Sequence, residues 1–320
     1  MKRLLIIFTA LLMFATTMSA GEKLTIRDIT GSKFSAKMVN GMNPISGTDT
    51  YARIDGKKIV SYSFKTGKQV SVLFDADNTI GKKIDGFDSY IFSPDGKRML
   101  IQTKTEKIYR RSYKAEFYIY NIASRRLDPL SDGGPQQVPT WSNDGLQVAF
   151  VRDNNIFLVK LLYDNAEIQV TKDGKFNEVI NGLPDWVNEE EFGFNRALTF
   201  NADGTMLCWL RYDESKVKTY SLQMYKGLAP ENEEYADYPG FYSYKYPKAG
   251  EDNSRMSAWS YDIKSHKINK LQVPLDEDGY MPRIKPTDNP ASIVVYTMNR
   301  HQDQLCLYSV NPRSTVAQLM

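Results

Sequence analysis

Hydrophobic and polar residues alternate in short runs along most of the chain, and turn-forming residues separate the runs. Three segments share one pattern, in which an aromatic residue precedes a polar turn ending in Asp-Gly, and an apolar run follows. Asp-Gly readily adopts the positive φ that a tight hairpin turn requires, and the runs have the length of strands. The pattern predicts β-hairpins at "FSPDGKRMLIQT" (92–103), "WSNDGLQVAFVR" (141–152) and "FNADGTMLCWLR" (200–211).

Further strand pairs follow these hairpins, and an earlier pair precedes them. They read "KKIVSYSFKTGKQVSVL" from Lys57, "EFYIYNIASRRLDPL" from Glu116, "NNIFLVKLLYDNAEIQVT" from Asn154 and "SAWSYDIKSHKINKLQV" from Ser257. The Asp-Gly glycines are 49 and 59 residues apart, close to the roughly 40–50 residues of a four-stranded propeller blade with loop insertions. We expect an all-β fold: an N-terminal segment at 21–45, then roughly four to five β-propeller blades of four-stranded antiparallel sheets at 46–320.

Two segments interrupt the repeat. "GLPDWVNEEEFGFNRA" (182–197) stands before the third Asp-Gly hairpin, and a segment rich in acids and aromatics, 231–254, interrupts a later blade. Asp185 can cap a short helix that carries the glutamates, and long loops commonly serve binding or assembly. The last ten residues, "NPRSTVAQLM", show no obvious closing strand, so the propeller is expected to be incomplete.

Composition fits a well-cored protein, with 42% hydrophobic and 12% aromatic residues and a net charge of +3. Lys2 and Arg3 precede an apolar run and small residues up to Ala20, which predicts a secretory signal peptide at 1–20 and a secreted or periplasmic location. No later segment is apolar enough to span a membrane, and no basic stripe suggests nucleic acid. Of the two cysteines, Cys208 lies in an apolar run and is expected to be buried rather than disulfide-bonded.

The consecutive acids Glu189, Glu190 and Glu191 have two interpretations. They form either a solvated helix face or a site for a cation, since adjacent carboxylates repel one another unless a cation relieves them. Arg110 and Arg111, taken alone, would be surface charge. No metal cluster, phosphate loop or cofactor motif accompanies them, and the tyrosines, among them Tyr113, Tyr118 and Tyr120, are expected to pack within blades.

The inserted segments also resemble a known family. "DWVNEEEF" (185–192) is similar to the Asp-Trp-Val-x-Glu-Glu-Glu motif of dipeptidyl peptidase IV and its relatives among the prolyl oligopeptidases. "YRRSYKAEFYIYNI" from Tyr109 resembles the arginine-bearing segment of that family, and "KYPKAGEDN" from Lys245 and "LTIRDITGSKF" from Leu24 resemble two others. Four motifs in the family's order cover nearly the whole chain after the signal peptide.

The resemblance implies an eight-bladed propeller that caps an α/β-hydrolase domain. In that family the two domains together release X-Pro or X-Ala dipeptides, and the proteins commonly form homodimers. It also implies that Glu190 and Glu191 bind the peptide's free α-ammonium and that Arg110 contacts a backbone carbonyl, while Glu189 is structural. The 320 residues contain no Gly-x-Ser-x-Gly elbow, and His266 and His301 lack a Ser and Asp pattern, so this chain alone should lack a catalytic triad and be inactive. The alternative is a non-catalytic periplasmic propeller that binds peptides or a protein.

Overall fold

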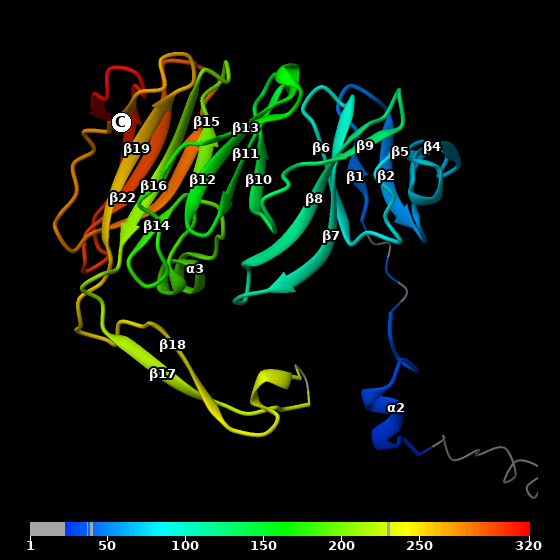
Figure 1. Cartoon of the computed structure of the whole chain (residues 1–320), viewed down its shortest axis with the longest axis horizontal. Coiled ribbons are helices and arrows are strands. Elements are labelled where there is room, and N and C mark those ends of the chain that lie inside the picture. Colours follow the sequence, from blue (N-terminus) through cyan, green and yellow to red (C-terminus); the bar gives the residue numbers. More distant parts are fainter. Residues whose placement is uncertain (1–22, 37, 39–40, 229–230) are drawn as a thin grey trace, which may run out of the picture. The chain divides into compact units, whose positions relative to one another are not determined.

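The computed structural model describes residues 23–36, 38, 41–228 and 231–320, and most of the regular structure in them is β-strand (Figure 1). The expected signal peptide lies outside the described residues. The chain divides into two units, Met1–Met42 and Asn43–Met320. In the first unit, Thr25 and Asp28 form a capping box at the start of the short helix α2 (Ile26–Thr30). Within the part of the chain that is described, no helix has the length and hydrophobicity needed to cross a bilayer.

Five sheets of four or five strands follow one another in the described part of the second unit. In sheet order their strands are β1 (Asn43–Pro44), β2 (Thr50–Asp55), β3 (Lys58–Ser63) and β4 (Gln69–Asp75); β5 (Ile80–Gly81), β9 (Arg126–Pro129), β8 (Tyr113–Asn121), β7 (Arg98–Lys107) and β6 (Ser89–Phe92); β10 (Gln137–Trp141), β11 (Gln147–Arg152), β12 (Asn155–Lys160) and β13 (Ala166–Gln169); β14 (Val179–Asn181), β16 (Met206–Asp213), β19 (Arg255–Asp262) and β20 (Ile268–Lys270), with β15 (Leu198–Phe200) also on β16; and β21 (Tyr280–Pro286), β22 (Ile293–Met298), β23 (Leu305–Val310) and β24 (Ala317–Leu319). Every pairing is antiparallel except β5 with β9. The short 3-10 helices are η1 (Ala76–Asn78), η2 (Leu161–Tyr163) and η3 (Glu233–Tyr235).

The three Asp-Gly hairpins form as expected and share one register. Each aromatic residue pairs with the residue seven positions later, in the pairs Phe92 with Met99, Trp141 with Val148 and Phe200 with Leu207. The glycines Gly96, Gly145 and Gly204 have φ of 67°, 67° and 68°. A side chain is strained at such a φ, so the glycine of the motif has a direct conformational reason.

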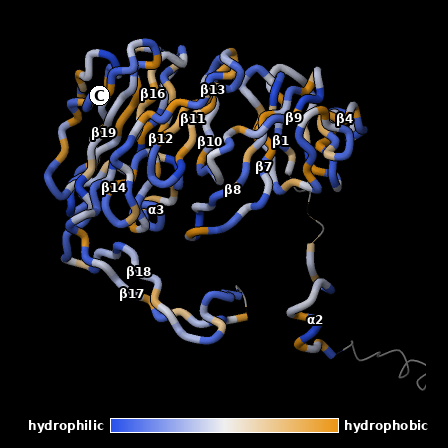
Figure 2. Tube along the Cα trace, in the orientation of Figure 1, coloured by the Kyte–Doolittle hydropathy of each residue, from blue (hydrophilic) through white to orange (hydrophobic). Residues whose placement is uncertain are grey.

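Consecutive sheets pack face to face through their hydrophobic residues. One buried cluster joins the first and second sheets, a second joins the second and third, and the largest joins the third, fourth and fifth. Figure 2 shows hydrophobic positions along central strands such as β11 and β16, with hydrophilic residues concentrated in the connections. Tyr118 and Tyr120 are buried in these clusters, and Tyr113 packs against one of them, as the sequence predicts for blade tyrosines. Stacked antiparallel sheets of this kind are the architecture of propeller blades.

Two short strands lie outside the expected pattern, and one expected boundary needs correction. In the final residues, β24 pairs with β23 through Val310 and Ala317 and forms the outer strand of the last sheet. The second insertion begins before residue 231, because β17 (Thr219–Met224) pairs with β18 (Gly240–Lys245) in a long hairpin between β16 and β19. Both were missed because short polar strands carry a weak hydrophobic pattern. Cys208 is buried and both cysteines are free, as the sequence favours.

Candidate active-site segment

The glutamates lie on a short helix, α3 (Trp186–Phe192), between β14 and β15. Asp185 caps its start, where an Asp185 carboxylate oxygen accepts a hydrogen bond from the Asn188 amide at 2.9 Å. Gly193 ends the helix with φ of 70°, a conformation that glycine adopts without strain. The sequence predicts both the short helix and its Asp185 cap, and the structure confirms them.

The three glutamates occupy three different environments. Glu189 is 2% exposed, and its Oε1 accepts hydrogen bonds from the backbone N–H groups of Arg111 at 2.7 Å and Ser112 at 2.8 Å. Glu190 is half-buried, whereas Glu191 is exposed and has no hydrogen-bond or ion-pair partner among the described residues. Helical spacing separates adjacent side chains by about 100°, so one helix sends the three acids in different directions.

Arg110 lies at the tip of the β7–β8 hairpin, 80 residues from its partner Glu190. Its Nε donates to both carboxylate oxygens of Glu190, at 2.8 and 2.9 Å. The structure therefore brings together two of the three residues that the sequence singles out, and it places the third, Glu191, next to them on the helix. One acid is already paired with a guanidinium, while its neighbour has an open carboxylate.

A cavity of about 840 Å³ lies beside the N-terminal end of α3. Asp185, Trp186 and Glu189 contribute to its lining, together with Tyr109 and the carboxyl side chain of Glu214 just after β16. Glu214 is only 6% exposed. Burial raises its pKa to about 8, the charge of Asp185 adds to the effect, and Lys245 opposes it.

Asp185 itself is a buried acid held by neutral donors. Burial raises its pKa, whereas hydrogen bonds from Ser254 and Asn188 act in the opposite direction. Ser254 immediately precedes β19, so this bond ties the start of α3 to the strand that follows the β17–β18 hairpin. Sequence patterns miss Glu214 and Ser254, because nothing in the local sequence marks a polar residue that is buried by distant segments.

Aromatic rings connect α3 and the Arg110 turn to the base of the β17–β18 hairpin. The ring centroids of Trp186 and Tyr246 are 4.4 Å apart, and those of Tyr109 and Tyr244 are 6.2 Å apart. Aromatic pairs at such separations contribute about 0.5–1.5 kcal/mol each beyond the area they bury. The hairpin base is thus packed against the same two segments that carry the acids and Arg110.

Comparison with known proteins shows the family of this chain. A sequence profile described as "Dipeptidyl peptidase IV (DPP IV) N-terminal region" matches residues 93–319. The chain belongs to this family. Its described sheets match the corresponding region of the crystal structure of Porphyromonas gingivalis dipeptidyl peptidase 4 with a TM-score of 0.87 and 38% identity, over 93% of this chain and 42% of that one.

The chain is also similar to curated proteins and to a second solved structure. A probable dipeptidyl-aminopeptidase B of Tuber melanosporum is 31% identical over 93% of this chain and 36% of its own length. A second, from Podospora anserina, is 38% identical over 67% of this chain and 24% of its own. A Bacteroides ovatus structure titled a putative dipeptidyl aminopeptidase IV, at 21% identity and a TM-score of 0.65, supports the fold alone. The chain spans between about a quarter and about a third of the length of these curated relatives.

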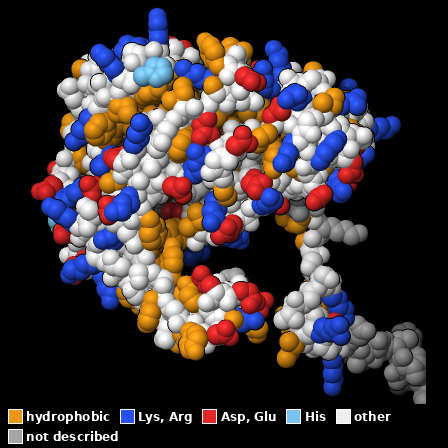
Figure 3. Space-filling view, in the orientation of Figure 1, with side chains coloured by type: hydrophobic (Ala, Val, Ile, Leu, Met, Phe, Trp, Pro, Cys, Tyr) orange, Lys and Arg blue, Asp and Glu red, His pale blue; other side chains and the backbone are white. Residues whose placement is uncertain are grey.

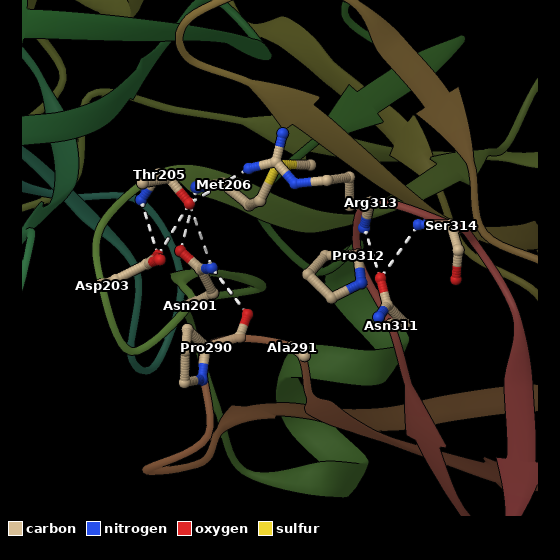
Figure 4. Close-up of a pocket in the computed structure, with 10 residues that line it drawn as sticks. All are labelled: Asn201, Asp203, Thr205, Met206, Pro290, Ala291, Asn311, Pro312, Arg313 and Ser314. Atoms are coloured by element: carbon tan, nitrogen blue, oxygen red, sulfur yellow. Dashed lines mark hydrogen bonds between the residues drawn. The ribbon is translucent and has the colours of Figure 1, made fainter.

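A second cavity, of about 380 Å³, lies away from the family motifs (Figure 4). It is lined by residues of the β15–β16 turn and by loops of the last sheet. The polar groups drawn there bond to one another: Asn201 donates to the Pro290 carbonyl at 2.8 Å, Thr205 donates to Asp203 at 2.7 Å, and Asn311 accepts from the amide of Arg313 at 2.9 Å. This cavity therefore lies between the fourth and fifth sheets of the domain. Among the described residues, no cluster of His, Cys, Asp or Glu has the geometry to hold a metal ion.

Proposed function

We propose that this chain is the substrate-binding propeller of a dipeptidyl peptidase and that it binds peptides by their free amino terminus. Glu190 and Glu191 accept hydrogen bonds from the α-ammonium, and Arg110 donates to a backbone carbonyl of the bound peptide. An ammonium has three N–H donors and no acceptor, so two adjacent carboxylates suit it and an N-acylated peptide lacks the required charge.

One observation carries the proposal: Arg110 and Glu190 form an ion pair next to the open carboxylate of Glu191. The guanidinium offsets part of the repulsion between Glu190 and Glu191. Arg110 keeps further N–H donors beyond Nε, and these remain for a carbonyl. A solvated helix face would need neither the pairing nor the partner 80 residues away.

The finer parts of the proposal come from the family. The complete protein would have an eight-bladed propeller and an α/β-hydrolase domain with a Ser-Asp-His triad, would form a homodimer and would release X-Pro or X-Ala dipeptides. Holding the amine at a fixed distance from the nucleophile selects the bond after the second residue, because binding energy at one end positions the other. The signal peptide predicted at residues 1–20 favours a secreted or periplasmic protein.

The test is product analysis with the longest natural chain that contains these residues. Its coding sequence should encode Gly-x-Ser-x-Gly followed by Asp and His, and incubation with a peptide whose second residue is proline should release the intact N-terminal dipeptide. Release of single amino acids, or cleavage inside the peptide, would contradict the proposal. A natural chain that binds peptides without cleaving them would support the non-catalytic alternative.

A further inference from the structure

The Arg110 turn is bonded to helix α3 through its backbone as well as through its side chain. The backbone amides of Arg111 and Ser112 both donate hydrogen bonds to Oε1 of Glu189, at 2.7 and 2.8 Å. Two N–H groups that donate to one carboxylate oxygen make charge-assisted hydrogen bonds, which are stronger than bonds between neutral groups. Glu189 is 2% exposed, so water competes little for them.

One of these amides belongs to the peptide unit that contains the carbonyl of Arg110. Because a peptide unit is planar, a bond to the Arg111 N–H fixes the orientation of the plane that leaves the Arg110 Cα. Asn195 adds a second restraint from the far side of α3, since its Nδ2 donates to the Arg111 carbonyl at 2.9 Å. The turn also closes on itself, as the Ile108 amide donates to the Ser112 carbonyl at 2.9 Å. The backbone on both sides of Arg110 is thereby held.

The side chain of Arg110 needs this support because it is exposed. In its ion pair with Glu190 the arginine side chain is 68% exposed. An exposed pair is worth only about 0–1 kcal/mol, which is too little to order a flexible hairpin tip by itself. A guanidinium that must meet a peptide carbonyl has to be placed in advance, since a mobile one loses binding energy to ordering.

We propose that Glu189 is a positioning residue that sets Arg110 for peptide binding, with Asn195 in support; the inference rests on the proposed function. The three acids then divide the work along one helix. Glu189 holds the backbone of the turn, Glu190 holds the side chain of Arg110 and shares the ammonium, and Glu191 supplies the open carboxylate. The buried acid acts on the peptide only through Arg110.

The test combines amide exchange with peptide binding on the full chain. Glu189→Leu removes the oxygen that accepts both hydrogen bonds, and we expect hydrogen exchange at the Arg111 and Ser112 amides and at the Arg110 Nε–H to accelerate about 10–100-fold, on the scale of lost charge-assisted bonds. Glu189→Gln keeps a carbonyl oxygen at the same place, so it should restore most of the protection. Asp288→Asn, which removes one exposed charge in the β21–β22 loop, is the matched control and should change none of these signals.

Binding is measured with the tripeptide Ala-Pro-Ala and its N-acetyl form. The wild type should prefer the free amine, Glu189→Leu should weaken free-amine binding about 10-fold, and Glu189→Gln should recover most of it. Unchanged exchange at Arg111 and Ser112 in Glu189→Leu would overturn the positioning role. Faster exchange with unaltered binding would also overturn it, because the clamp would then be structural only. Failure of the wild type to distinguish the two peptides, with exchange behaving as expected, would instead overturn the proposed function and the inference with it.

Discussion

The two inserted segments are alike in composition and opposite in structure. Residues 182–197 and the β17–β18 hairpin both mix acids with aromatic residues. In the first, Asp185, Asn188 and Glu189 are at most 5% exposed, and the carboxylates of Asp185 and Glu189 accept hydrogen bonds from other segments. In the hairpin, Phe241 is 69% exposed and Tyr238 is 82% exposed. Figure 3 shows hydrophobic side chains at the surface of this hairpin.

The difference shows that the structure of an acidic insertion depends on the hydrogen-bond partners of its carboxylates. In the α3 segment, hydrogen bonds from the helix cap and from backbone amides offset the cost of burying negative charge, and the result is a fixed geometry. The hairpin is joined to the body mainly at its base, through the rings of Tyr244 and Tyr246 and the contact of Asn177 with the Ser243 carbonyl at 3.3 Å. Changes in the two segments should therefore have different consequences.

The largest expected effect is on activity, at Glu190 and Glu191. Glu190→Gln and Glu191→Gln keep the shape of the side chain and remove its charge, so each should lower kcat/KM for dipeptide release by about 10–100-fold. The free energy of unfolding should change by less than about 1 kcal/mol, because Glu191 is exposed and the half-buried Glu190 is paired with an exposed arginine. Steady-state kinetics of the complete protein and urea unfolding provide the two numbers. Equal losses of activity and stability would point to a purely structural role.

The next effect is on stability, at the helix cap. Asp185→Ala removes the cap of α3 and leaves the buried Ser254 hydroxyl without its acceptor. We expect a loss of about 2 kcal/mol in the free energy of unfolding, whereas Asp185→Asn, which retains an acceptor oxygen, should lose less than half of that. Urea denaturation of both variants measures the difference. A neutral result for Asp185→Ala would mean that the segment is not held in the way described.

A third effect depends on pH and comes from Glu214. The pKa of about 8 in the folded chain lies above the unfolded value of about 4.3, so the unfolded state ionises first. Stability should fall as pH rises between these values, by at most about 1.4 kcal/mol per pH unit. Asp185 contributes in the same direction, while Lys245 opposes it. Glu214→Gln should flatten this slope and stabilise the chain on the order of 1–3 kcal/mol at pH 8. The measurement is the free energy of unfolding of the wild type and of Glu214→Gln from pH 5 to 9. The same dependence on pH in both proteins would show that Glu214 is solvated and would contradict this prediction.

The smallest effect is expected at the hairpin. Phe241→Ser and Tyr238→Ser replace exposed rings, and each should change the free energy of unfolding by no more than about 0.5 kcal/mol. Tyr246→Ser is the contrasting variant, because its ring contacts Trp186, and it should cost more than about 1 kcal/mol. Thermal unfolding of the three variants ranks them. A large loss from either exposed ring would remove the contrast between the two insertions.

The sequence predicts the parts of this fold that depend on neighbours in the chain. Asp-Gly turns, the Asp185 cap and the helix at the glutamates follow from local rules, and the structure has all of them. The pairing of Arg110 with Glu190 and the bond from the Arg111 amide to Glu189 join residues about 80 positions apart, and they form only because the tip of the β7–β8 hairpin meets α3 in the folded chain. The raised pKa of Glu214 is unpredictable for the same reason, because burial is a property of the assembled sheets. The family resemblance supplied the identity of the acids, and the assembled structure supplied their partners.

Glu190 and Glu191 are proposed to bind the free amino terminus of the peptide, and the ratio of two kcat/KM values tests this most directly. The measurement is kcat/KM of the complete protein for a single proline-containing peptide with a free amine, divided by that for its N-acetyl form. We expect a large ratio in the wild type, on the order of 100 or more since two charge-assisted interactions are lost on acetylation, and a smaller ratio in Glu190→Gln and Glu191→Gln. A wild-type ratio near one would contradict the account and return the three glutamates to the role of a solvated helix face.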